Sequence, residues 1–477
     1  MSSTSASSAL CRRQFLQAGA ACATIGFAGR SLAASDDGRA VTLRPGPARV
    51  PMVGDEVPPT AVWGYNGATP GPALRLRQGT PFRATVTNGL AETTTVHWHG
   101  MRLPNAMDGV PGLTQRPIPP GDSFDYAFTP PDAGTFWYHS HDHSLEQMGR
   151  GLAGALIVEE AAPPTVDREI LWVVQDWRLD PDAQIAPGFH NRMEIAMDGR
   201  VGNTVTINGR LPQTLHARAG ERIRLRLLNA AIARIMALQF EGHVPVIVAL
   251  DGQPCAPHTP ADGRILLGPA MRADVMLDMQ GEPGRRYRVV DEFYDRLAYT
   301  LVRIAYDAAP PLRAHPLDAP LRLPANPVPR PDLASAIVHE VRLQGGMMGG
   351  IMTGMGNGGG MMGMGGAAWA INGRSMTGDG SAGMPPLFAI DRGRSCILDF
   401  RNQTAWWHPM HLHGHSFQVL DRDGEAVPHD EWGDTVLVSP RERVRVAFVA
   451  DNPGDWMLHC HVMEHQIGGL MTTLRVS

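Results

Sequence analysis

The sequence predicts an all-β protein made of three related β-sandwich domains, and three observations support that prediction. Short β-type runs such as 82–87, 223–228 and 443–449 recur along the 477 residues, separated by some of the 53 Gly and 40 Pro. Helical periodicity is scarce. A single pattern of turn and strand signals occurs three times, at a period too long for a solenoid.

The first 34 residues are expected to be an export signal. Arg12-Arg13 begins a twin-arginine pattern, a weakly apolar stretch covers 18–28, and Ser31-Leu32-Ala33 fits small-x-small cleavage. We therefore expect export to the periplasm by the twin-arginine route, which carries folded proteins.

The internal repeat begins with an Asn-Gly pair, continues with a turn glycine, and runs through a strand to an asparagine nine residues after that glycine. The three copies carry these residues at Asn66, Gly79 and Asn88, at Asn208, Gly220 and Asn229, and at Asn372, Gly393 and Asn402. Pro-rich stretches at 161–164 and 309–331 fit linkers. The predicted domains are therefore 35–160, 161–314 and 315–477.

Copies 1 and 3 carry paired histidines at matching positions, and copy 2 carries none there. Nine residues after the last asparagine stand His97-Trp98-His99 in copy 1 and His411-Leu412-His413 in copy 3. Five residues after a later glycine stand His139-Ser140-His141 and His459-Cys460-His461. Copy 2 has Leu238 and Phe240 at the first place and Val289 and Asp291 at the second.

Strand geometry explains the spacing. Residues i and i+2 of a strand point to one face, so each His-x-His offers two imidazoles in one direction. Four pairs, two from each of copies 1 and 3, can converge where these domains face each other. Eight imidazoles suit copper or a similar borderline metal and do not suit Ca²⁺ or Mg²⁺.

Cys460 lies between two of these histidines, so its side chain points to the opposite face. With His408 and His465 it makes the His₂Cys donor set of a blue-copper electron-transfer site. Copy 1 has Thr94, Ser140 and Leu145 at the matching positions, so we expect no such site there.

These segments resemble the signatures of the multicopper oxidases, the family of laccases and cuprous oxidases, over the chain from about residue 40 to its end. The resemblance implies three cupredoxin-like Greek-key β-sandwich domains and four copper ions, of which one is type 1, one type 2 and two type 3. By position His97 and His411 would hold the type 2 ion. The type 3 pair would be held by His99, His139, His141, His413, His459 and His461. The type 1 ion would be held by His408, Cys460 and His465.

The resemblance also implies four one-electron oxidations of a substrate coupled to reduction of O₂ to water, with electrons passing from the type 1 site through the Cys460 strand. Asp108 is the predicted proton-delivering carboxylate, and the alternative reading is a simple Asp108-Gly109 turn. Asp434 resembles a family residue near the type 1 site, where we expect a structural hydrogen bond.

The chain departs from many bacterial relatives at the axial position. Leu470 stands five residues after His465, where those relatives have Met, and a shift of one residue on a strand turns Met471 to the other face. We expect no axial thioether and a raised type 1 potential. Gln466 stands where some relatives carry an acid, so part of their proton path is expected to be absent.

Residues 345–366 form a Gly-rich segment with seven methionines, too rich in glycine for a helix. Its Gly content suits a flexible linker, whereas its thioethers suit Cu(I). Relatives with a Met-rich insertion at this place resemble cuprous oxidases. The predicted Cu(I)-binding residues are Met347, Met348, Met352, Met355, Met361, Met362 and Met364.

Composition excludes several other functions. The 42 basic residues are all arginine, so no Schiff-base or phosphate-loop lysine is available, and a net charge of −5 without a basic block argues against nucleic acid. No apolar run has the length of a membrane span, and we expect a monomer. A disulfide between Cys255 and Cys396 is left open.

Three functions remain to be compared. The first is a periplasmic oxidase for copper homeostasis that uses Cu(I) and O₂, with phenols as the alternative, laccase-type substrates. The second is a copper-binding or storage protein without turnover. The third is a cupredoxin-fold structural protein without copper, which the complete set of eleven ligands argues against.

Overall fold

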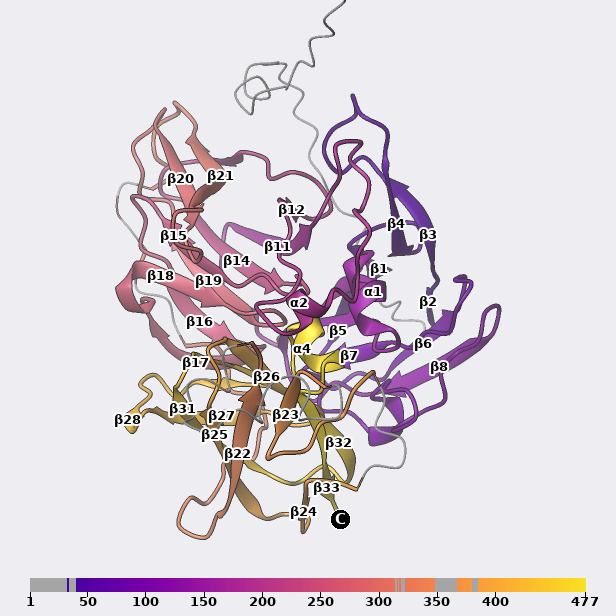
Figure 1. The fold of residues 1–477 in the computed structure, drawn as a ribbon. Coiled ribbons are helices and arrows are strands. Elements are labelled where there is room, and N and C mark those ends of the chain that lie inside the picture. Colours follow the sequence, from indigo (N-terminus) through magenta and orange to yellow (C-terminus); the bar gives the residue numbers. More distant parts are fainter. Residues whose placement is uncertain are drawn as a thin grey trace, which may run out of the picture.

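The structure of the chain, a computed structural model, describes residues 32–33, 40–313, 315, 317–318, 322–347, 367–379 and 385–477. The predicted all-β fold is confirmed: three sandwiches of mostly antiparallel sheets pack around a shared centre (Figure 1). Most of the predicted export signal, and six of the seven segment methionines, lie outside the described residues.

The first sandwich closes over a core that includes Trp98, Phe136 and Tyr138. Its larger sheet has the strand order β1-β5-β10-β9-β7 and its smaller sheet β2-β6-β8, beside a β3–β4 hairpin. The strands are β1 (Leu32–Ala33), β2 (Val41–Leu43), β3 (Pro45–Val50), β4 (Thr60–Tyr65), β5 (Gly71–Arg77), β6 (Phe82–Thr87), β7 (His97–His99), β8 (Ser123–Phe128), β9 (Gly134–His139) and β10 (Ala153–Glu159).

The second sandwich pairs the sheets β12-β11-β14-β19-β16-β17 and β13-β21-β20-β15-β18. Leu238 and Val289, which replace histidines of the other copies, lie in its apolar core. The strands are β11 (Arg168–Trp177), β12 (Thr204–Ile207), β13 (Leu215–Ala217), β14 (Arg222–Asn229), β15 (Met236–Phe240), β16 (Val246–Leu250), β17 (Gln253–His258), β18 (Arg264–Leu267), β19 (Arg272–Asp278), β20 (Arg286–Asp291) and β21 (Tyr299–Tyr306).

The third sandwich pairs the sheet β23-β22-β25-β31-β27-β28, with β29 beside β27, and the sheet β24-β33-β32-β26-β30. The strands are β22 (Ile337–Gly345), β23 (Trp369–Ile371), β24 (Phe388–Ile390), β25 (Ser395–Asn402), β26 (His408–Leu412), β27 (Phe417–Arg422), β28 (Glu425–Ala426), β29 (Trp432–Gly433), β30 (Thr435–Val438), β31 (Arg443–Val449), β32 (Gly454–Cys460) and β33 (Met471–Val476).

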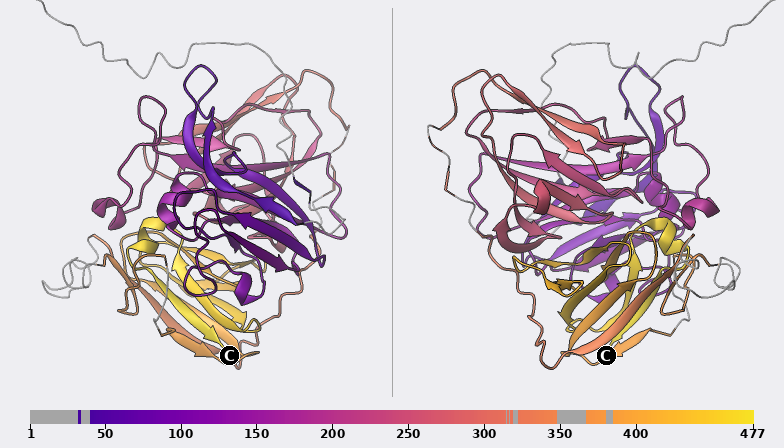
Figure 2. Two further views of the ribbon diagram at one scale, coloured as in Figure 1. Left: turned by 90° about the vertical axis from the view of Figure 1, so that its right-hand side faces the viewer. Right: turned by 60° about the vertical axis from the view of Figure 1, so that its left-hand side comes forward.

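Three short helices meet at the centre, where the domains adjoin. Helix α4 (Met463–Ile467) of the third domain lies beside α1 (Ser144–Gly149) of the first and α2 (Arg192–Ile195) of the second (Figures 1 and 2). Among the residues that the structure describes, η2 (Asn105–Met107) and η3 (Ala261–Gly263) are 3₁₀ turns. The C-terminal strand β33 pairs with β24 and β32 in the third domain.

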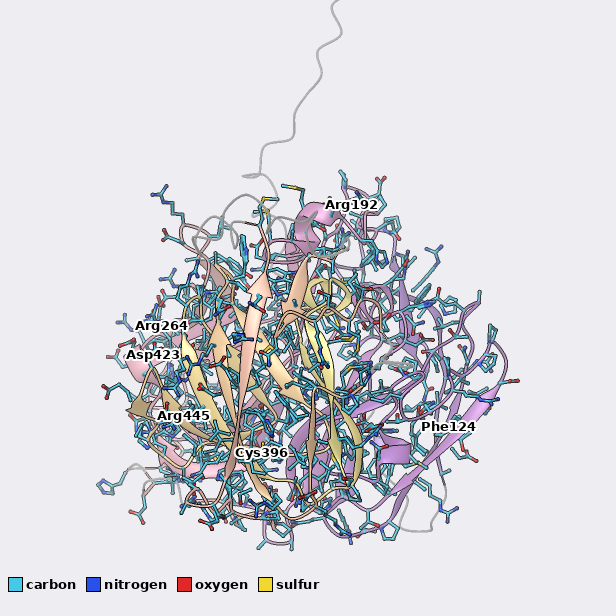
Figure 3. The ribbon with its side chains drawn as sticks, turned by 60° about the horizontal axis from the view of Figure 1, so that its bottom comes forward. Phe124, Arg192, Arg264, Cys396, Asp423 and Arg445 are labelled. Carbon is cyan, nitrogen blue, oxygen red and sulfur yellow. The ribbon has the colours of Figure 1, made fainter. Side chains whose placement is uncertain are left out.

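Cys255, Cys396 and Cys460 are free and buried. A disulfide between Cys255 and Cys396 is therefore not formed, because Cys255 lies on β17 of the second domain and Cys396 inside the core of the third (Figure 3). Among the described residues, no helix combines the length and apolar character needed to cross a membrane.

Candidate metal centres

The eight predicted cluster histidines come together between the first and third sandwiches. In the first domain β7 pairs with β9, which places His97 opposite His139, and in the third β26 pairs with β32, which places His411 opposite His459. All eight side chains belong to residues that are at most 1% exposed. The structure thus brings the four His-x-His pairs into one closed, buried group.

Distances within this group are those of potential ligands to shared ions. The rings of His99 and His411 stack with centroids 3.7 Å apart, and those of His97 and His413 lie 4.0 Å apart. Nε2 of His413 is 3.0 Å from Nε2 of His459. Three sets of three of these histidines have ligand atoms within 4.8 Å of one another, namely His97, His99 and His139; His97, His411 and His413; and His141, His413 and His459.

Hydrogen bonds decide which ring nitrogen is left for a metal. In four of the histidines Nδ1 donates to a backbone carbonyl, at 2.7 Å for His97 to Asp108 and 2.9 Å for His411 to Asp434. The other two donate at 2.8 Å for His139 to Ser140 and 2.9 Å for His459 to Cys460. This arrangement fixes the tautomer and directs the Nε2 lone pair inward.

The cluster contains buried polar atoms that no residue satisfies. Nε2 of His97, His139 and His411, Nδ1 of His99, and both ring nitrogens of His141 and His461 have no hydrogen-bond partner among the described residues. Such atoms are costly in a protein interior unless something binds them. Borderline metal ions supply that partner, so the donor set fits copper.

Burial also keeps the imidazoles in the ligating form. Loss of hydration lowers the pKa of His99, His139, His141, His413, His459 and His461 well below the usual value, and neighbouring imidazoles lower it further. The pKa of His411 is lowered for the same first reason, although Asp434 opposes the shift. These rings are neutral at neutral pH, as metal ligation requires.

Two buried carboxylates each reach across the domain interface. Asp108 of the first domain accepts a hydrogen bond from Nδ1 of His413 (2.9 Å), and its Oδ1 lies 3.3 Å from Nδ1 of His97 without a hydrogen bond. The turn reading holds as well, because Gly109 has φ +84° and an added Cβ would lie 1.9 Å from the Val96 carbonyl. The structure therefore places Asp108 in contact with the histidine cluster.

Asp434 lies at the histidine cluster and not at the Cys460 site, so the expected location was wrong. Its Oδ1 accepts from Nε2 of His99 at 3.0 Å, and its backbone carbonyl accepts from Nδ1 of His411, which pairs with the next residue, Thr435. It also accepts two hydrogen bonds from Arg272 on β19, at 2.5 and 2.9 Å. The pKa of Asp434 is held well below its usual range, because the Arg272 and His411 contacts outweigh burial.

Sequence reasoning missed Arg272 and its second partner, Asp251. Arg272 is fully buried, and Asp251 accepts from the backbone N–H groups of Arg272 and Thr435 at 2.8 and 3.1 Å. Burial raises the pKa of Asp251 to about 7. An arginine at the start of the β run 272–278, in the domain that lacks the His-x-His pairs, was the available signal.

The second predicted site forms on the other face of β32. Sγ of Cys460 lies 3.6 Å from Nδ1 of His408 and 3.5 Å from Nδ1 of His465, and the two nitrogens are 3.1 Å apart. Nε2 of His465 donates to the Met197 carbonyl (2.5 Å), and Nε2 of His408 lies 2.8 Å from Oγ1 of Thr404. Both Nδ1 lone pairs therefore face the thiol, as a His₂Cys site needs.

The surroundings of this site are apolar. Burial raises the pKa of the Cys460 thiol, so a metal would have to displace its proton. Leu470 packs in the same core cluster as Cys460, whereas Met471 lies in a different cluster with Val110 and Met376. Gln466 donates to Oγ of Ser144 at 3.2 Å.

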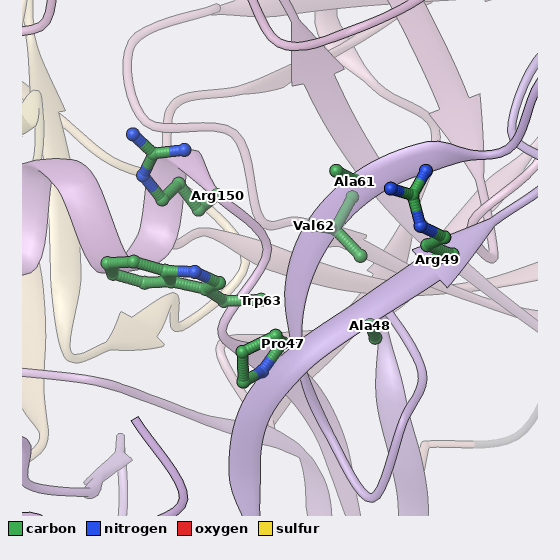
Figure 4. Close-up of a pocket in the computed structure, with 7 residues that line it drawn as sticks. All are labelled: Pro47, Ala48, Arg49, Ala61, Val62, Trp63 and Arg150. Carbon is green, nitrogen blue, oxygen red and sulfur yellow. The ribbon is translucent and has the colours of Figure 1, made fainter. Parts of the chain in front are cut away.

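A surface hollow of about 380 Å³ lies on the β3–β4 hairpin, apart from the histidines. Arg150 stands over the ring of Trp63, 4.9 Å from its centroid (Figure 4). The lining residues are Pro47, Ala48, Arg49, Ala61, Val62, Trp63 and Arg150. None of them is a cysteine, a histidine or a carboxylate, so this hollow is not a metal site.

Comparisons with known proteins agree with this geometry. Models of multicopper oxidase domains match residues 49–163, 168–303 and 363–477. The chain is 31% identical to multicopper oxidase MmcO of Mycobacterium tuberculosis, over 98% of this chain and 93% of that protein. It is 27% identical to Laccase-2 of Botryotinia fuckeliana, over 85% and 77%.

A solved structure shares the whole fold. The multicopper oxidase from Pseudomonas thermotolerans superimposes with a TM-score of 0.81 at 35% identity, and the match covers 94% of this chain and all of that one. The arrangement of the three sandwiches is therefore shared with a multicopper oxidase of known structure.

Proposed function

Because this chain belongs to the multicopper oxidase family and is an oxidoreductase, we propose that it oxidises Cu(I) in the periplasm at the expense of O₂, and so contributes to copper tolerance. One type 1, one type 2 and two type 3 coppers would be held by the residues assigned above. Copper bound there supplies the one-electron acceptor for the substrate and the site of O₂ reduction.

Cu(I) is favoured as the substrate by the position of the residues that flank the Met-rich segment. Before it, Met347 donates its N–H to the Ala196 carbonyl at 2.7 Å, one residue from the Met197 carbonyl that binds His465. After it, Trp369 packs on the His465 ring with centroids 4.3 Å apart. The described residues on both sides of residues 348–366, Met347 and Trp369, therefore lie close to the Cys460 site.

The chain's own residues also suit electron transfer between the two sites. Cys460 and His459 are neighbours on β32 with side chains on opposite faces, and His461 follows with its N–H donating to Pro409 at 2.7 Å. Electrons could therefore pass from the Cys460 thiol to the imidazoles of His459 and His461 through a few covalent bonds of one strand. Asp108 lies at the histidine cluster, where a proton carrier for O₂ reduction is required.

The test measures O₂ uptake by the copper-loaded protein with Cu(I) and, separately, with a phenol. Replacing the seven segment methionines by leucine keeps length and glycine content and removes only the thioethers. We expect Cu(I) oxidation to fall and phenol oxidation to be kept. Deleting 345–366 should act likewise, or increase phenol oxidation by uncovering the site.

A laccase-type function is the second candidate, favoured by the relative named Laccase-2. It would be supported by fast phenol oxidation together with Cu(I) oxidation that the Met-to-Leu replacement leaves unchanged. No O₂ uptake with either substrate would support copper storage instead. Fractionation of cells that express the full chain tests the proposed periplasmic location.

A further inference from the structure

Outside the two copper sites, another group of potential ligands meets where the second and third domains touch. Strand β17 carries Cys255 and His258, and the turn before β29 supplies His429 and Glu431. A backbone hydrogen bond from Ala256 N to the His429 carbonyl (2.8 Å) joins the two segments. None of these residues belongs to the repeat pattern.

Two contacts within this group are short, although the side chains of His258, His429 and Glu431 do not bring all their ligand atoms within 4.8 Å of one another as the buried histidine sets do. The rings of His258 and His429 stack with centroids 4.0 Å apart and an interplanar angle of 3°. Nε2 of His258 lies 4.0 Å from Oε1 of Glu431, inside the 4.8 Å spread of the buried histidine sets. Ligand atoms this close can share one ion after small side-chain rotations, and exposed His429 is free to make them.

The tautomer of His258 is set as in the copper cluster. Nδ1 donates to the Ala256 carbonyl at 2.8 Å, which leaves the lone pair on Nε2, the ring nitrogen that lies 4.0 Å from Oε1 of Glu431. Burial raises the pKa of Glu431, and no described arginine lies within ion-pair distance of it. The thiol of Cys255 lies on the Nδ1 side, 3.9 Å away, so it borders the group without facing the free lone pair.

His429 lies in a turn whose backbone adopts the left-handed conformation. His429 and Asp430 have φ values of +72° and +55°, which non-glycine residues rarely adopt. Asp430 sustains the turn by accepting hydrogen bonds from Arg330 and Arg322, at 2.6 and 2.7 Å. Strain of this kind persists where the surrounding contacts fix a special geometry.

We propose that His258, His429 and Glu431 bind a divalent ion of the borderline class, such as Zn²⁺ or Cu²⁺, at the junction of the second and third domains. Two imidazoles and a carboxylate are common ligands of such ions. The ion would link β17 to the turn before β29 and stabilise this junction. The site is separate from the four-copper machinery and does not depend on the identity of the oxidised substrate.

Zinc is the appropriate probe, because it has no redox chemistry. Untagged, copper-loaded protein is dialysed against Zn²⁺, and bound zinc and copper are both counted. We expect one zinc per chain with copper unchanged, and a higher Tm with zinc present. His258→Ala and Glu431→Gln should bind zinc at least tenfold more weakly and lose the Tm shift. His216→Ala, which removes an exposed histidine of the same domain, should behave as the parent protein.

Blue absorption in each variant verifies that the fold and the Cys460 site are intact before zinc is measured. Cys255→Ser should retain zinc binding. The proposal is overturned if the parent protein binds no zinc, or if His258→Ala and Glu431→Gln bind it as tightly as His216→Ala does. Loss of binding in Cys255→Ser would show that the ligand set is wrong.

Discussion

The corresponding positions in the first and third domains hold different chemistry on the same scaffold. In the third domain His408 and His465 flank the buried thiol of Cys460, which lies in an apolar core. In the first domain Thr94 stands at the position that matches His408, and Ser140 at the position that matches Cys460. Both hydroxyls donate a hydrogen bond to Oε1 of Gln147, at 2.7 and 2.5 Å. One copy thus offers free lone pairs and the other a satisfied polar network.

The same two domains are reciprocal at the cluster. Asp108 of the first domain holds His413 of the third, and Asp434 of the third holds His99 of the first. Only Asp434 also has a buried arginine partner, Arg272 of the second domain. The residues on the strand face opposite the histidine cluster therefore decide whether a domain can hold a metal site by itself. The histidine cluster, in contrast, needs side chains from both domains.

The largest effect is expected from Cys460→Ser, which gives the third domain the residue found in the first. Removing a residue around a metal ligand costs about 10–100-fold in activity or affinity, so loss of the ligand itself should lower oxidase activity by more than about 100-fold. The blue absorption should disappear while three coppers remain bound. Metal analysis and visible spectra check this, and a retained blue band would break the comparison.

Asp434→Asn should lower the free energy of unfolding more than Asp108→Asn does. It leaves the Arg272 charge buried without its main partner, which costs about 3–5 kcal/mol. The matched change Asp108→Asn leaves no buried arginine unpaired, so it should cost less stability and act mainly on turnover, by about 10–100-fold. Urea unfolding and O₂ uptake separate the two, and equal losses of stability would contradict the asymmetry.

Ser140→Ala should test whether the polar network of the first domain is needed. It leaves part of the hydrogen-bonding capacity of buried Gln147 unused, at a cost of about 1–3 kcal/mol. The control Ser123→Ala removes an exposed hydroxyl on β8 and should change stability by less than about 0.5 kcal/mol. Copper content should be unchanged in both, since neither serine is a predicted ligand.

The smallest change in stability is expected from Leu470→Met, a volume-conserving replacement that costs less than about 1.5 kcal/mol. Its thioether would become available beside Cys460, so the type 1 potential should fall. Redox titration of the blue band measures it. A rise, or no change, would show that residue 470 does not reach the axial position.

The sequence by itself predicted the three sandwiches, the family and the eleven residues that the structure brings into two groups. It could do so because strand periodicity determines which side chains share a face, and because the repeat made matching positions comparable. The sequence also predicted that copy 2 has no histidine groups, and Leu238 and Val289 indeed lie in its apolar core.

Only the tertiary structure decided the contacts that cross domains. The Arg272–Asp434 pair, the Met197 carbonyl on His465 and the free state of Cys255 and Cys396 join or separate residues far apart in the chain. The choice of ring nitrogen in His97, His99, His411 and His413 likewise depends on a carbonyl or carboxylate brought by another segment. Local periodicity carries no information about such partners, because domain packing sets their distances.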